Sequence, residues 1–391
     1  MRILMSATTW FEGEPGGLGR YFTEVARELS ATGHQVAAVV TGDSPGQFSS
    51  GLLRVVRVTG RSLPVRVMGF YRALAAELNN HKYDVFNPHF ALYVFLPMLL
   101  GLLKNCPVVF NFQGPWAEET RFELSGLHGR LSLRHRLSCG VKRCIERYVY
   151  QRCAGLVVLS REFKDLLVEK YGVKPGKIIV LAGGCDVNKF TPGSRMEARR
   201  RLGLPEGARV VFTVRRLVKR TGVELIIKAL KLVRSRHKDA ILLVGGEGPL
   251  RPALELLARE MGVAEAVIFT GYISEDDLPY YYRAADVMTV PSLAYEGFGL
   301  VTVEALACGT PVIGTPVGGT LEILSGLEPK LLARSISAGS LAEKLDSVLS
   351  GENWVPGRAR CREFVLKNYS WSVAAREVLA VFQEKAGASR V

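Results

Sequence analysis

The chain has 391 residues, of which 48% are hydrophobic and 23% charged, and its formal net charge is +14. This composition is typical of a folded globular protein and excludes extended disorder, while the length favours two domains of roughly 100–200 residues each. The positive charge fits an anionic ligand, a membrane surface or a nucleic acid, and by itself it does not choose among them.

Cysteine usage and the apolar runs bear on the compartment. The seven cysteines form no C-x-x-C pair and their number is odd, which favours a reducing compartment over a disulfide framework. The apolar start of the chain is too short for a signal peptide. The most apolar stretch, Phe90–Leu103, contains Pro97 and is too short to span a bilayer. We expect a cytoplasmic protein, with any membrane contact peripheral and on the inner face.

The first half of the chain alternates apolar runs with helical spacing. Arg2–Ala7 is expected to form a strand, followed by a glycine-rich loop and a helix over Tyr21–Leu29 that Gly33 stops. Further short apolar runs bounded by breakers predict strands of a buried parallel sheet: His34–Thr41, Asp84–Asn87, Val108–Phe112 and Leu156–Ser160.

The pattern restarts after the stretch L-A-G-G-C-D-V-N-K-F-T-P-G. The strands expected there are Val210–Val214, Ile241–Val244, Val267–Thr270, Val287–Val290 and Val312–Gly314, with helices such as Gly222–Val233 and Arg251–Met261 between them. This alternation predicts two doubly wound α/β domains, 1–187 and 188–368, whose ligands bind beyond the carboxyl ends of the strands. Residues 369–391, with a helix over Trp371–Gln383, either stay with the second domain or cross back to the first.

A glycine loop follows the first expected strand. Gly13, Gly16, Gly17 and Gly19 precede a helix, and bare backbone at a helix N-terminus can bind a phosphate. The spacing is neither G-x-G-x-x-G nor a P-loop. A tight strand–helix turn is therefore an equal alternative.

The segment P-S-L-A-Y-E-G-F-G-L-V-T-V-E-A-L-A-C-G-T-P-V-I is more specific. Its glycines predict a loop at Glu296, and its spacing predicts a helix over Leu300–Ala307 that contains Glu304. The free N–H groups from Phe298 to Val301 can bind an anion. This order of acceptor, anion nest and acceptor matches the sugar, diphosphate and ribose of a nucleotide sugar. Two solvated surface glutamates are the alternative.

Two more loops follow strands. The basic string V-R-R-L-V-K-R-T-G contains Arg215, Arg216, Lys219 and Arg220, and such cations can neutralise a departing diphosphate or can simply be solvated. The backbone groups of the string V-G-G-E-G-P-L, residues 244–250, can contact a ligand, or the string can be a turn without a binding role.

These pieces together resemble the retaining glycosyltransferases of family 4, which have the GT-B fold. The most specific element is the E-x7-E motif formed by Glu296 and Glu304, and E-A-L-A-C-G-T-P-V-I, V-G-G-T-L-E-I-L and G-C-D-V-N-K-F-T-P stand where the family has similar strings. The resemblance implies two Rossmann-like domains facing across a cleft, with a nucleotide-sugar donor in the second domain and the acceptor mainly in the first.

The resemblance also implies roles for residues. Glu296 accepts from sugar hydroxyls, Glu304 accepts from ribose hydroxyls, and Arg216 matches the family's diphosphate arginine. Catalysis is assigned to Glu296, Arg216 and Arg220. The donor site comprises Gly16, Gly17, Arg216, Lys219, Arg220, Glu296, Phe298, Gly299, Leu300, Val301 and Glu304.

The chain departs from the family at two places. The family commonly has Lys where this chain has Thr221, and Arg220 or Lys219 could supply that charge, although the two side chains are not equivalent. The family usually has His where this chain has Gln113, which can hydrogen-bond a hydroxyl but cannot take a proton near pH 7. His89 matches a second family histidine or is a buried, hydrogen-bonded one. Both His89 and Gln113 are expected on the acceptor and sugar side.

The expected reaction is hexosyl transfer to a hydroxyl with retention, along a front-face route in which the leaving diphosphate helps to deprotonate the acceptor. A double displacement needs a carboxylate nucleophile, and the sequence does not point to one. No metal or other cofactor is expected, because Glu275–Asp277 reads as helix capping. UDP is favoured as the donor base, with GDP next. The acceptor class is a saccharide or lipid-linked saccharide of glycan biosynthesis, and no nucleic-acid partner is expected.

Other functions remain compatible with the same residues. A sugar-nucleotide epimerase, a glycoside phosphorylase and a non-catalytic sugar-nucleotide-binding protein are the alternatives.

The basic segment 121–152 adds a question about partners. One helical face collects apolar residues, namely Leu133, Leu137, Val141, Cys144, Ile145 and Tyr148. This face either rests on an anionic membrane, which would suit a lipid-linked acceptor, or packs on the domain core.

Overall fold

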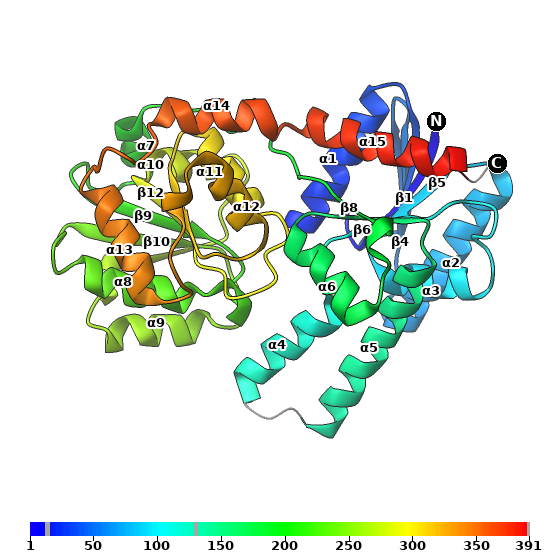
Figure 1. Cartoon of the computed structure of the whole chain (residues 1–391), viewed down its shortest axis with the longest axis horizontal. Coiled ribbons are helices and arrows are strands. Elements are labelled where there is room, and N and C mark those ends of the chain that lie inside the picture. Colours follow the sequence, from blue (N-terminus) through cyan, green and yellow to red (C-terminus); the bar gives the residue numbers. More distant parts are fainter. Residues whose placement is uncertain (12–15, 129–131, 389–391) are drawn as a thin grey trace. The chain divides into compact units, whose positions relative to one another are not determined.

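The computed structural model describes residues 1–11, 16–128 and 132–388. The chain divides into two compact units. The N-terminal unit comprises Met1–Arg121, Leu131–Gly184 and Trp371–Val391, and the C-terminal unit comprises Phe122–Arg130 and Cys185–Ser370. The last helix, α15 (Trp371–Ala388), thus belongs to the N-terminal unit (Figure 1). The sequence analysis placed the boundaries at 187 and 368 and left the docking of this helix open.

The N-terminal unit is built on parallel strands. One sheet has the order β3-β4-β2-β1-β5, made of β1 (Arg2–Ser6), β2 (Gln35–Thr41), β3 (Gly46–Ser50), β4 (Leu53–Val58) and β5 (Val85–Pro88). A second sheet has the order β6-β7-β8, made of β6 (Val109–Phe112), β7 (Gly155–Val158) and β8 (Ile178–Val180). A parallel bridge between Phe86 and Val108 links the two sheets.

Only β3 pairs antiparallel among these strands, and the sequence analysis did not anticipate it. Its residues G-Q-F-S-S are almost all exposed, so it buries no apolar face that would have shown as a pattern. The strands that the apolar runs predicted are confirmed to within a few residues, because each lies buried on both faces of the sheet.

The helices of the N-terminal unit connect and cover these strands (Figure 1). They are α1 (Gly17–Ala31), α2 (Leu63–Asn80), α3 (Ala91–Leu99), the first part of α4 (Trp116–His128), α5 (Leu133–Arg152), α6 (Arg161–Tyr171), α15 and the short 3₁₀ helix Pro175–Lys177. Helix α1 buries the apolar face that its spacing predicted. Helix α15 packs on α1, where the rings of Trp371 and Tyr21 meet edge to face at 5.8 Å.

The apolar face of helix α5, for which the sequence analysis left membrane contact and packing on the core open, is not buried as a whole. Its buried residues are Cys139, Glu146, Val149 and Tyr150, whereas Leu133, Leu137 and Val141 are 82%, 70% and 54% exposed. Packing of the whole apolar face on the core is thus not observed, and the face that is buried contains a carboxylate and a phenol, which a hydrophobic pattern counts as polar.

The C-terminal unit is a single parallel sheet between helices. Its order is β11-β10-β9-β12-β13, made of β9 (Arg209–Val214), β10 (Ala240–Gly245), β11 (Val267–Gly271), β12 (Val287–Val290) and β13 (Val312–Gly314). The α-helices are α7 (Arg195–Arg201), α8 (Val223–Val233), α9 (Arg251–Glu260), α10 (Leu278–Ala284), α11 (Leu300–Ala307), α12 (Gly318–Leu327), α13 (Ala338–Leu349) and α14 (Arg358–Asn368). Short 3₁₀ helices lie at Lys219–Thr221, Ala264–Ala266 and Pro329–Leu331.

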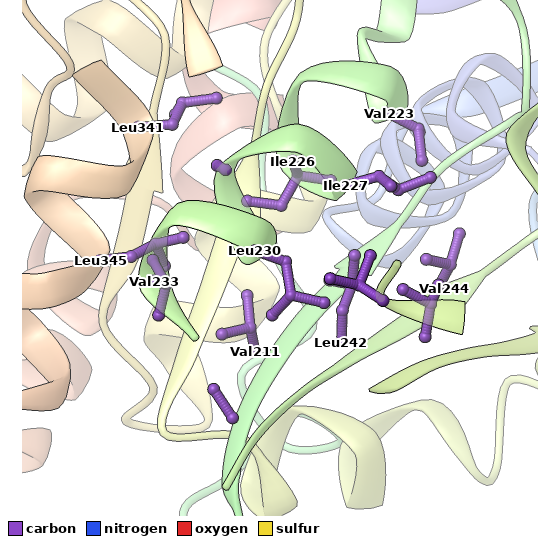
Figure 2. Close-up of a cluster of buried hydrophobic side chains, with 14 of the residues drawn as sticks. Val211, Val223, Ile226, Ile227, Leu230, Val233, Leu242, Val244, Leu341 and Leu345 are labelled. Carbon is purple, nitrogen blue, oxygen red and sulfur yellow. The ribbon is translucent and has the colours of Figure 1, made fainter. Parts of the chain in front are cut away.

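Figure 2 shows part of the core of this unit, in which α8 and α13 pack against the sheet. Val211, Leu242 and Val244 rise from β9 and β10 and are fully buried. Leu230 of α8 and Leu345 of α13 are buried in the same cluster. Burial of each such side chain stabilises the fold by about 1.5–3 kcal/mol. This core holds the strand ends, and with them the loops of the site, in a fixed frame.

Both units therefore have the doubly wound α/β architecture that the strand–helix alternation predicted. In the ranges that the structure describes, no helix combines the length and the apolar character needed to cross a bilayer.

Candidate active site

The strand order places a ligand site at one edge of the C-terminal sheet. From β9 the chain continues outward to β10 and β11, and it then returns to add β12 and β13 on the other side of β9. The switch point lies between β9 and β12, where doubly wound sheets bind their ligands beyond the carboxyl ends of the strands. Two loops leave the sheet at this point: residues 215–222 after β9 and residues 291–299 after β12.

Glycines hold these two loops together. Gly222 has φ +69°, and a Cβ there would lie 1.9 Å from the carbonyl oxygen of Pro291. The amide of Leu293 donates to the carbonyl of Arg220 at 2.8 Å. Any side chain at position 222 would separate the loops, so this glycine is required by close backbone approach.

Two glycine-containing strings identified in the sequence also hold these loops in place through close backbone packing. In V-G-G-E-G-P-L, Gly246 has φ +103° and its missing Cβ would lie 2.0 Å from the carbonyl oxygen of Arg215. In V-G-G-T-L-E-I-L, Gly318 is similarly close to the carbonyl oxygen of Glu296, which also accepts from the amide of Gly319 at 3.0 Å. Both strings act here as packing turns that fix the loops carrying Arg215 and Glu296.

Glu296 lies at the switch point and is buried. Its carboxylate accepts from the guanidinium of Arg215 and from the hydroxyl of Ser292. Burial alone would raise the pKa of Glu296, but the charge and hydrogen bond of Arg215, the hydrogen bond of Ser292 and the charge of Arg220 together lower it below its usual value. The carboxylate is therefore ionised at neutral pH, and its hydrogen bonds to Arg215 and Ser292 fix its orientation.

Arg215 and Arg216 point to different surroundings. Arg215 is buried against Glu296, with its side chain 7% exposed, while Arg216 is exposed. The sequence analysis counted both among the cations that could neutralise a diphosphate, and the family resemblance gave that role to Arg216 alone. Neighbouring residues at a strand end face opposite ways, so in an R-R pair only one can pack on the β12 loop. The sequence does not say which one does.

The rest of the basic string has mixed environments. The ammonium of Lys219 pairs with Glu224 at 2.7 Å. Thr221, which stands where the family commonly has Lys, is buried, and its hydroxyl donates to the carbonyls of Arg216 and Val218. Thr221 therefore fixes the turn. The charge of Arg220 acts on Glu296, which places a second cation in range of the site.

Glu304 lies within α11, as its spacing predicted. It is 2% exposed, and its carboxylate accepts from the hydroxyl of the fully buried Tyr282 at 2.8 Å. Neither glutamate of the E-x7-E motif is thus a solvated surface residue. The ribose contact expected of Glu304 remains a prediction, and Tyr282 is a partner that sequence spacing did not reveal.

The amino end of α11 lies between the two glutamates. Gly299 is the N-cap residue with φ +91°, so it brings no side chain to the first N–H groups of the helix. Phe298 is buried, and Leu300 and Val301 are half-buried. A helix N-terminus carries about half a positive charge. Binding of a diphosphate here, between the two carboxylates, remains a prediction.

The acidic run Glu275–Asp277 does not cap α10 as expected. Asp277 stands at the N-cap position but makes no side-chain cap, and it pairs instead with Arg201 at 3.1 Å and Ser274 at 2.8 Å. Glu275 pairs with Lys189 at 2.9 Å. These carboxylates are engaged with neighbouring side chains, while the hydroxyl oxygen of Ser274 accepts from the amide of Asp277 at 3.1 Å.

In the N-terminal unit, His89 and Gln113 belong to one hydrogen-bonded chain. Asn87 donates to the carbonyl of Val109, which leaves its side-chain oxygen facing Nε2 of His89 at 2.9 Å. Nε2 of Gln113 donates to Asn111 at 2.9 Å and lies 3.4 Å from Nδ1 of His89. Gln113 therefore uses its amide N–H groups inside the protein.

His89 is 2% exposed, and burial lowers its pKa to about 3. The imidazole is thus neutral at physiological pH and satisfied on both nitrogens, which agrees with the buried-histidine alternative. Gly16 is exposed at the N-cap of α1 and Gly17 begins that helix. Gly13 lies outside the described residues.

Glu146 is a buried acid that the sequence analysis overlooked. Its carboxyl oxygens accept from the amides of Trp116 and Ala117 at 2.8 and 3.2 Å, and from the hydroxyls of Tyr150 and Tyr171 at 3.1 and 2.9 Å. Burial raises the pKa of Glu146 to about 7, because its effect exceeds the opposing effect of these four hydrogen bonds. Glu146 thereby fixes the start of α4, directly after the Gln113 loop. Its position in a basic helix gave no signal of this role.

Two hollows of the N-terminal unit lie at the other ends of the strands. One is lined by residues that begin β1, β2 and β4, such as Arg2, Gln35 and Arg54. The other is lined by residues that precede β6, β7 and β8, such as Val108, Ala154 and Lys177. Because ligands of doubly wound sheets bind at the carboxyl ends, neither hollow is the candidate site.

The fold is that of GT-B proteins. Sucrose-phosphate synthase from Thermosynechococcus elongatus aligns with a TM-score of 0.83 at 22% identity, covering 99% of each chain. HepE of Anabaena, solved in complex with UDP and glucose, aligns with a TM-score of 0.78 at 17% identity, covering 98% of this chain and all of its own.

Sequence comparison identifies the family within this fold. Residues 15–189 match the family model "Glycosyltransferase Family 4", and residues 194–367 match "Glycosyl transferases group 1". The chain is a glycosyltransferase of the group 1 and family 4 type. A D-inositol 3-phosphate glycosyltransferase of Corynebacterium aurimucosum is 29% identical over 95% of this chain and 92% of its own. An uncharacterized glycosyltransferase of Methanocaldococcus jannaschii is 27% identical over 98% of both.

Proposed function

We propose that the protein is a retaining hexosyltransferase that moves a sugar from a nucleotide-sugar donor to a hydroxyl of a saccharide acceptor. The observation that carries this proposal is the ionised, buried Glu296 at the switch point, oriented by Arg215 and Ser292 beside the amino end of α11. Such a carboxylate can accept from sugar hydroxyls while the helix N-terminus takes the diphosphate.

The mechanism follows from this placement. The diphosphate gains negative charge as the glycosidic bond breaks, and the N–H groups of residues 300 and 301 with Arg216 and Arg220 stabilise that charge. The acceptor hydroxyl attacks from the same face and passes its proton to the departing phosphate. Glu296 holds the sugar and does not form a covalent bond. His89 takes no proton in this scheme, because burial keeps it neutral.

We further propose UDP as the donor base and a reaction without an essential metal. The UDP assignment is supported by the fold likeness to HepE, whose structure holds UDP and glucose. Cationic side chains at the switch point can supply the charge that a metal supplies elsewhere. A complete loss of activity in EDTA that Mg²⁺ or Mn²⁺ restores would contradict the metal-independent route.

The first experiment is a thermal-shift panel of UDP-, GDP-, ADP- and TDP-sugars. A ligand that binds only the folded state adds about 2.7 kcal/mol of stability at 100 times its Kd, so one nucleotide series should raise the midpoint. Glu304→Ala should abolish the shift, and Glu260→Ala, at an exposed position of α9, should retain it. A panel without any shift in the wild type contradicts the donor assignment.

Turnover then separates the alternatives. A glycosyltransferase consumes donor and yields a new glycoside only when acceptor is added. An epimerase converts the donor alone, a phosphorylase needs phosphate and no nucleotide, and a binding protein shows a thermal shift without product. The anomeric configuration of the product, read by NMR, decides between retention and inversion.

The exposed part of α5 supports a peripheral membrane contact and a lipid-linked acceptor. Leu133, Leu137 and Val141 form an exposed apolar stripe at intervals of four residues, and Arg134 and Arg136 are exposed between them. Apolar side chains insert among lipids while cations contact anionic headgroups, at about 1 kcal/mol for each cation near the surface.

Vesicle sedimentation tests this contact. The wild type should bind vesicles containing phosphatidylglycerol at low salt and should not bind pure phosphatidylcholine. The double variant Leu133→Glu, Leu137→Glu should lose this binding, whereas Leu256→Glu, which alters an exposed leucine of α9, should not. Equal binding by both variants would refute the role of α5.

A further inference from the structure

Glu146 is a fully buried acid that takes no part in the proposed transfer step. One of its carboxyl oxygens accepts from the amide of Trp116 and from the hydroxyl of Tyr150. The other oxygen accepts from the amide of Ala117 and from the hydroxyl of Tyr171. An ionised carboxylate satisfies all four donors at once, because both of its oxygens are acceptors.

The same carboxyl group faces a small cavity that it shares with the Gln113 loop. The cavity has a volume of about 10 Å³, and Glu146, Gln113 and His89 are among the residues that line it. A space of this size holds at most one water molecule. The loop from Gln113 to Trp116 is fixed at both ends: Asn111 accepts from the side chain of Gln113, and Glu146 accepts from the backbone of Trp116. A change at Glu146 therefore reaches Gln113 through few intervening atoms.

Protonation of Glu146 would alter its hydrogen bonds. A protonated carboxyl group contains one O–H donor, which must find an acceptor among groups that were donating to it. A tyrosine hydroxyl can rotate and accept, but the amides of Trp116 and Ala117 have fixed directions. Hydrogen bonds to an ionised acceptor are roughly twice as strong as neutral ones. The start of α4 is therefore held more firmly by the ionised form of Glu146 than by the protonated form.

The charged side chains around Glu146 are engaged with other groups. On α5, the ammonium of Lys142 donates to Thr120 at 2.9 Å, and Arg143 pairs with Glu118 of α4 at 3.6 Å. Glu119, the other carboxylate in the first turn of α4, lies beside Gly114. The four donors that reach Glu146 are all neutral, so its charge depends on burial and on these hydrogen bonds.

Other titratable groups packed around Glu146 keep one protonation state between pH 5 and 8. Burial raises the pKa values of the tyrosine and cysteine neighbours and lowers that of the histidine; these residues are Tyr150, Tyr171, Cys153 and His89. Burial raises the pKa of Glu146 to about 7. A change of charge near neutral pH at this place therefore belongs to Glu146.

We infer that Glu146 is a positioning residue for sugar transfer, whose ionised carboxylate holds the start of α4 and the Gln113 loop in the active arrangement and whose protonation releases them. This inference rests on the proposed function, in which Gln113 lies on the acceptor and sugar side. Turnover should rise with pH as Glu146 ionises. Donor affinity should stay constant, because the nucleotide is assigned to the C-terminal unit.

Profiles of kcat and KM between pH 5.5 and 8.5 test the inference with three variants. Glu146→Gln cannot ionise, Tyr171→Phe removes one donor to the ionised form, and Glu169→Gln is the control at an exposed position of α6. The donors are UDP-, GDP-, ADP- and TDP-glucose, each with free and with lipid-linked glucose as the acceptor. Circular dichroism establishes that each variant is folded, and Tyr171→Phe decides the question if Glu146→Gln is not.

The wild type and Glu169→Gln should show kcat rising with a midpoint near pH 7. Glu146→Gln should remain at the low-pH level of the wild type at every pH. Tyr171→Phe should move the midpoint upward by about one pH unit, because the hydrogen bond from Tyr171 lowers the pKa of Glu146. The donor Kd, measured by titration, should be the same for all four proteins. A purely structural role would leave no midpoint for Tyr171→Phe to move.

A second readout does not depend on turnover. In protein labelled with ¹⁵N-glutamine, the side-chain amide signal of Gln113, identified by its absence in Gln113→Glu, should shift with the same midpoint in the wild type and should not shift in Glu146→Gln. This signal reports whether Glu146 and the Gln113 loop are coupled.

The inference and the proposed function fail in different ways. If the wild type turns over and folded Glu146→Gln keeps the inflection, or if folded Tyr171→Phe has the midpoint of the wild type, Glu146 only stabilises the fold and the inference fails. If no donor and acceptor pair gives turnover, the proposed function fails and the role in transfer fails with it. The Gln113 signal then shows whether the coupling itself exists.

Discussion

The substitution Glu146→Gln should change how the stability of the N-terminal unit depends on pH. Glu146 is fully buried beneath the start of α4, with two backbone amides and two tyrosine hydroxyls donating to it. Burial raises its pKa from 4.5 to about 7 in the folded protein. Gln has nearly the same shape as the protonated acid but cannot lose a proton.

The sign of the effect follows from proton counting. Between pH 4.5 and 7 the folded state holds a proton on Glu146 that the unfolded state has released, so the free energy of unfolding falls as the pH rises. The raised pKa corresponds to about 3 kcal/mol lost by pH 8, at 1.36 kcal/mol per pKa unit. For a unit of this size, this loss corresponds to a decrease of roughly 6–12 °C in the midpoint of thermal unfolding. Gln adds a penalty for facing donors with its amide nitrogen, but that penalty does not vary with pH.

The assay is thermal unfolding at pH 5, 6, 7 and 8, followed by circular dichroism. We expect the midpoint of thermal unfolding of Glu146→Gln to increase relative to that of the wild type as the pH rises from 5 to 8. Glu169→Gln, an exposed change on α6, should run parallel to the wild type. A constant difference between Glu146→Gln and the wild type across this range would refute the reasoning.

Three further predictions concern the site. Tyr282→Phe removes the hydroxyl that donates to Glu304, so donor affinity in titration should fall about 3- to 10-fold, the range for one hydrogen bond, and an unchanged affinity would contradict a donor role for Glu304. Gly318→Ala places a Cβ against the backbone of Glu296 and should abolish turnover, whereas Gly339→Ala, which meets open space, should not. The pH–rate profile should show no inflection from His89 between pH 5 and 8, because burial lowers its pKa to about 3; loss of such an inflection in His89→Asn would show the opposite.

The sequence by itself determined the architecture. Apolar runs of three to eight residues bounded by breakers predicted parallel strands, because strands buried on both faces need apolar side chains throughout. The spacing of α11 was predicted to the residue, which placed Glu304 inside a helix and Glu296 in the loop before it. The exposed edge strand β3 was missed because it buries too little to leave a pattern, and the sequence analysis did not predict β4 or β8 either.

Only the tertiary structure decided which polar side chains meet. Arg215 and Glu296 are 81 residues apart in the chain, and no local pattern distinguishes Arg215 from Arg216. Glu146 lies in a basic helix whose sequence gives no sign of its role, and only the fold brings four donors from three elements to it. Periodicity reports how each segment faces the core, because burial of apolar area is a local requirement. Hydrogen bonds and ion pairs between distant segments depend on where the strands end and how the loops pack, and that is a property of the whole fold.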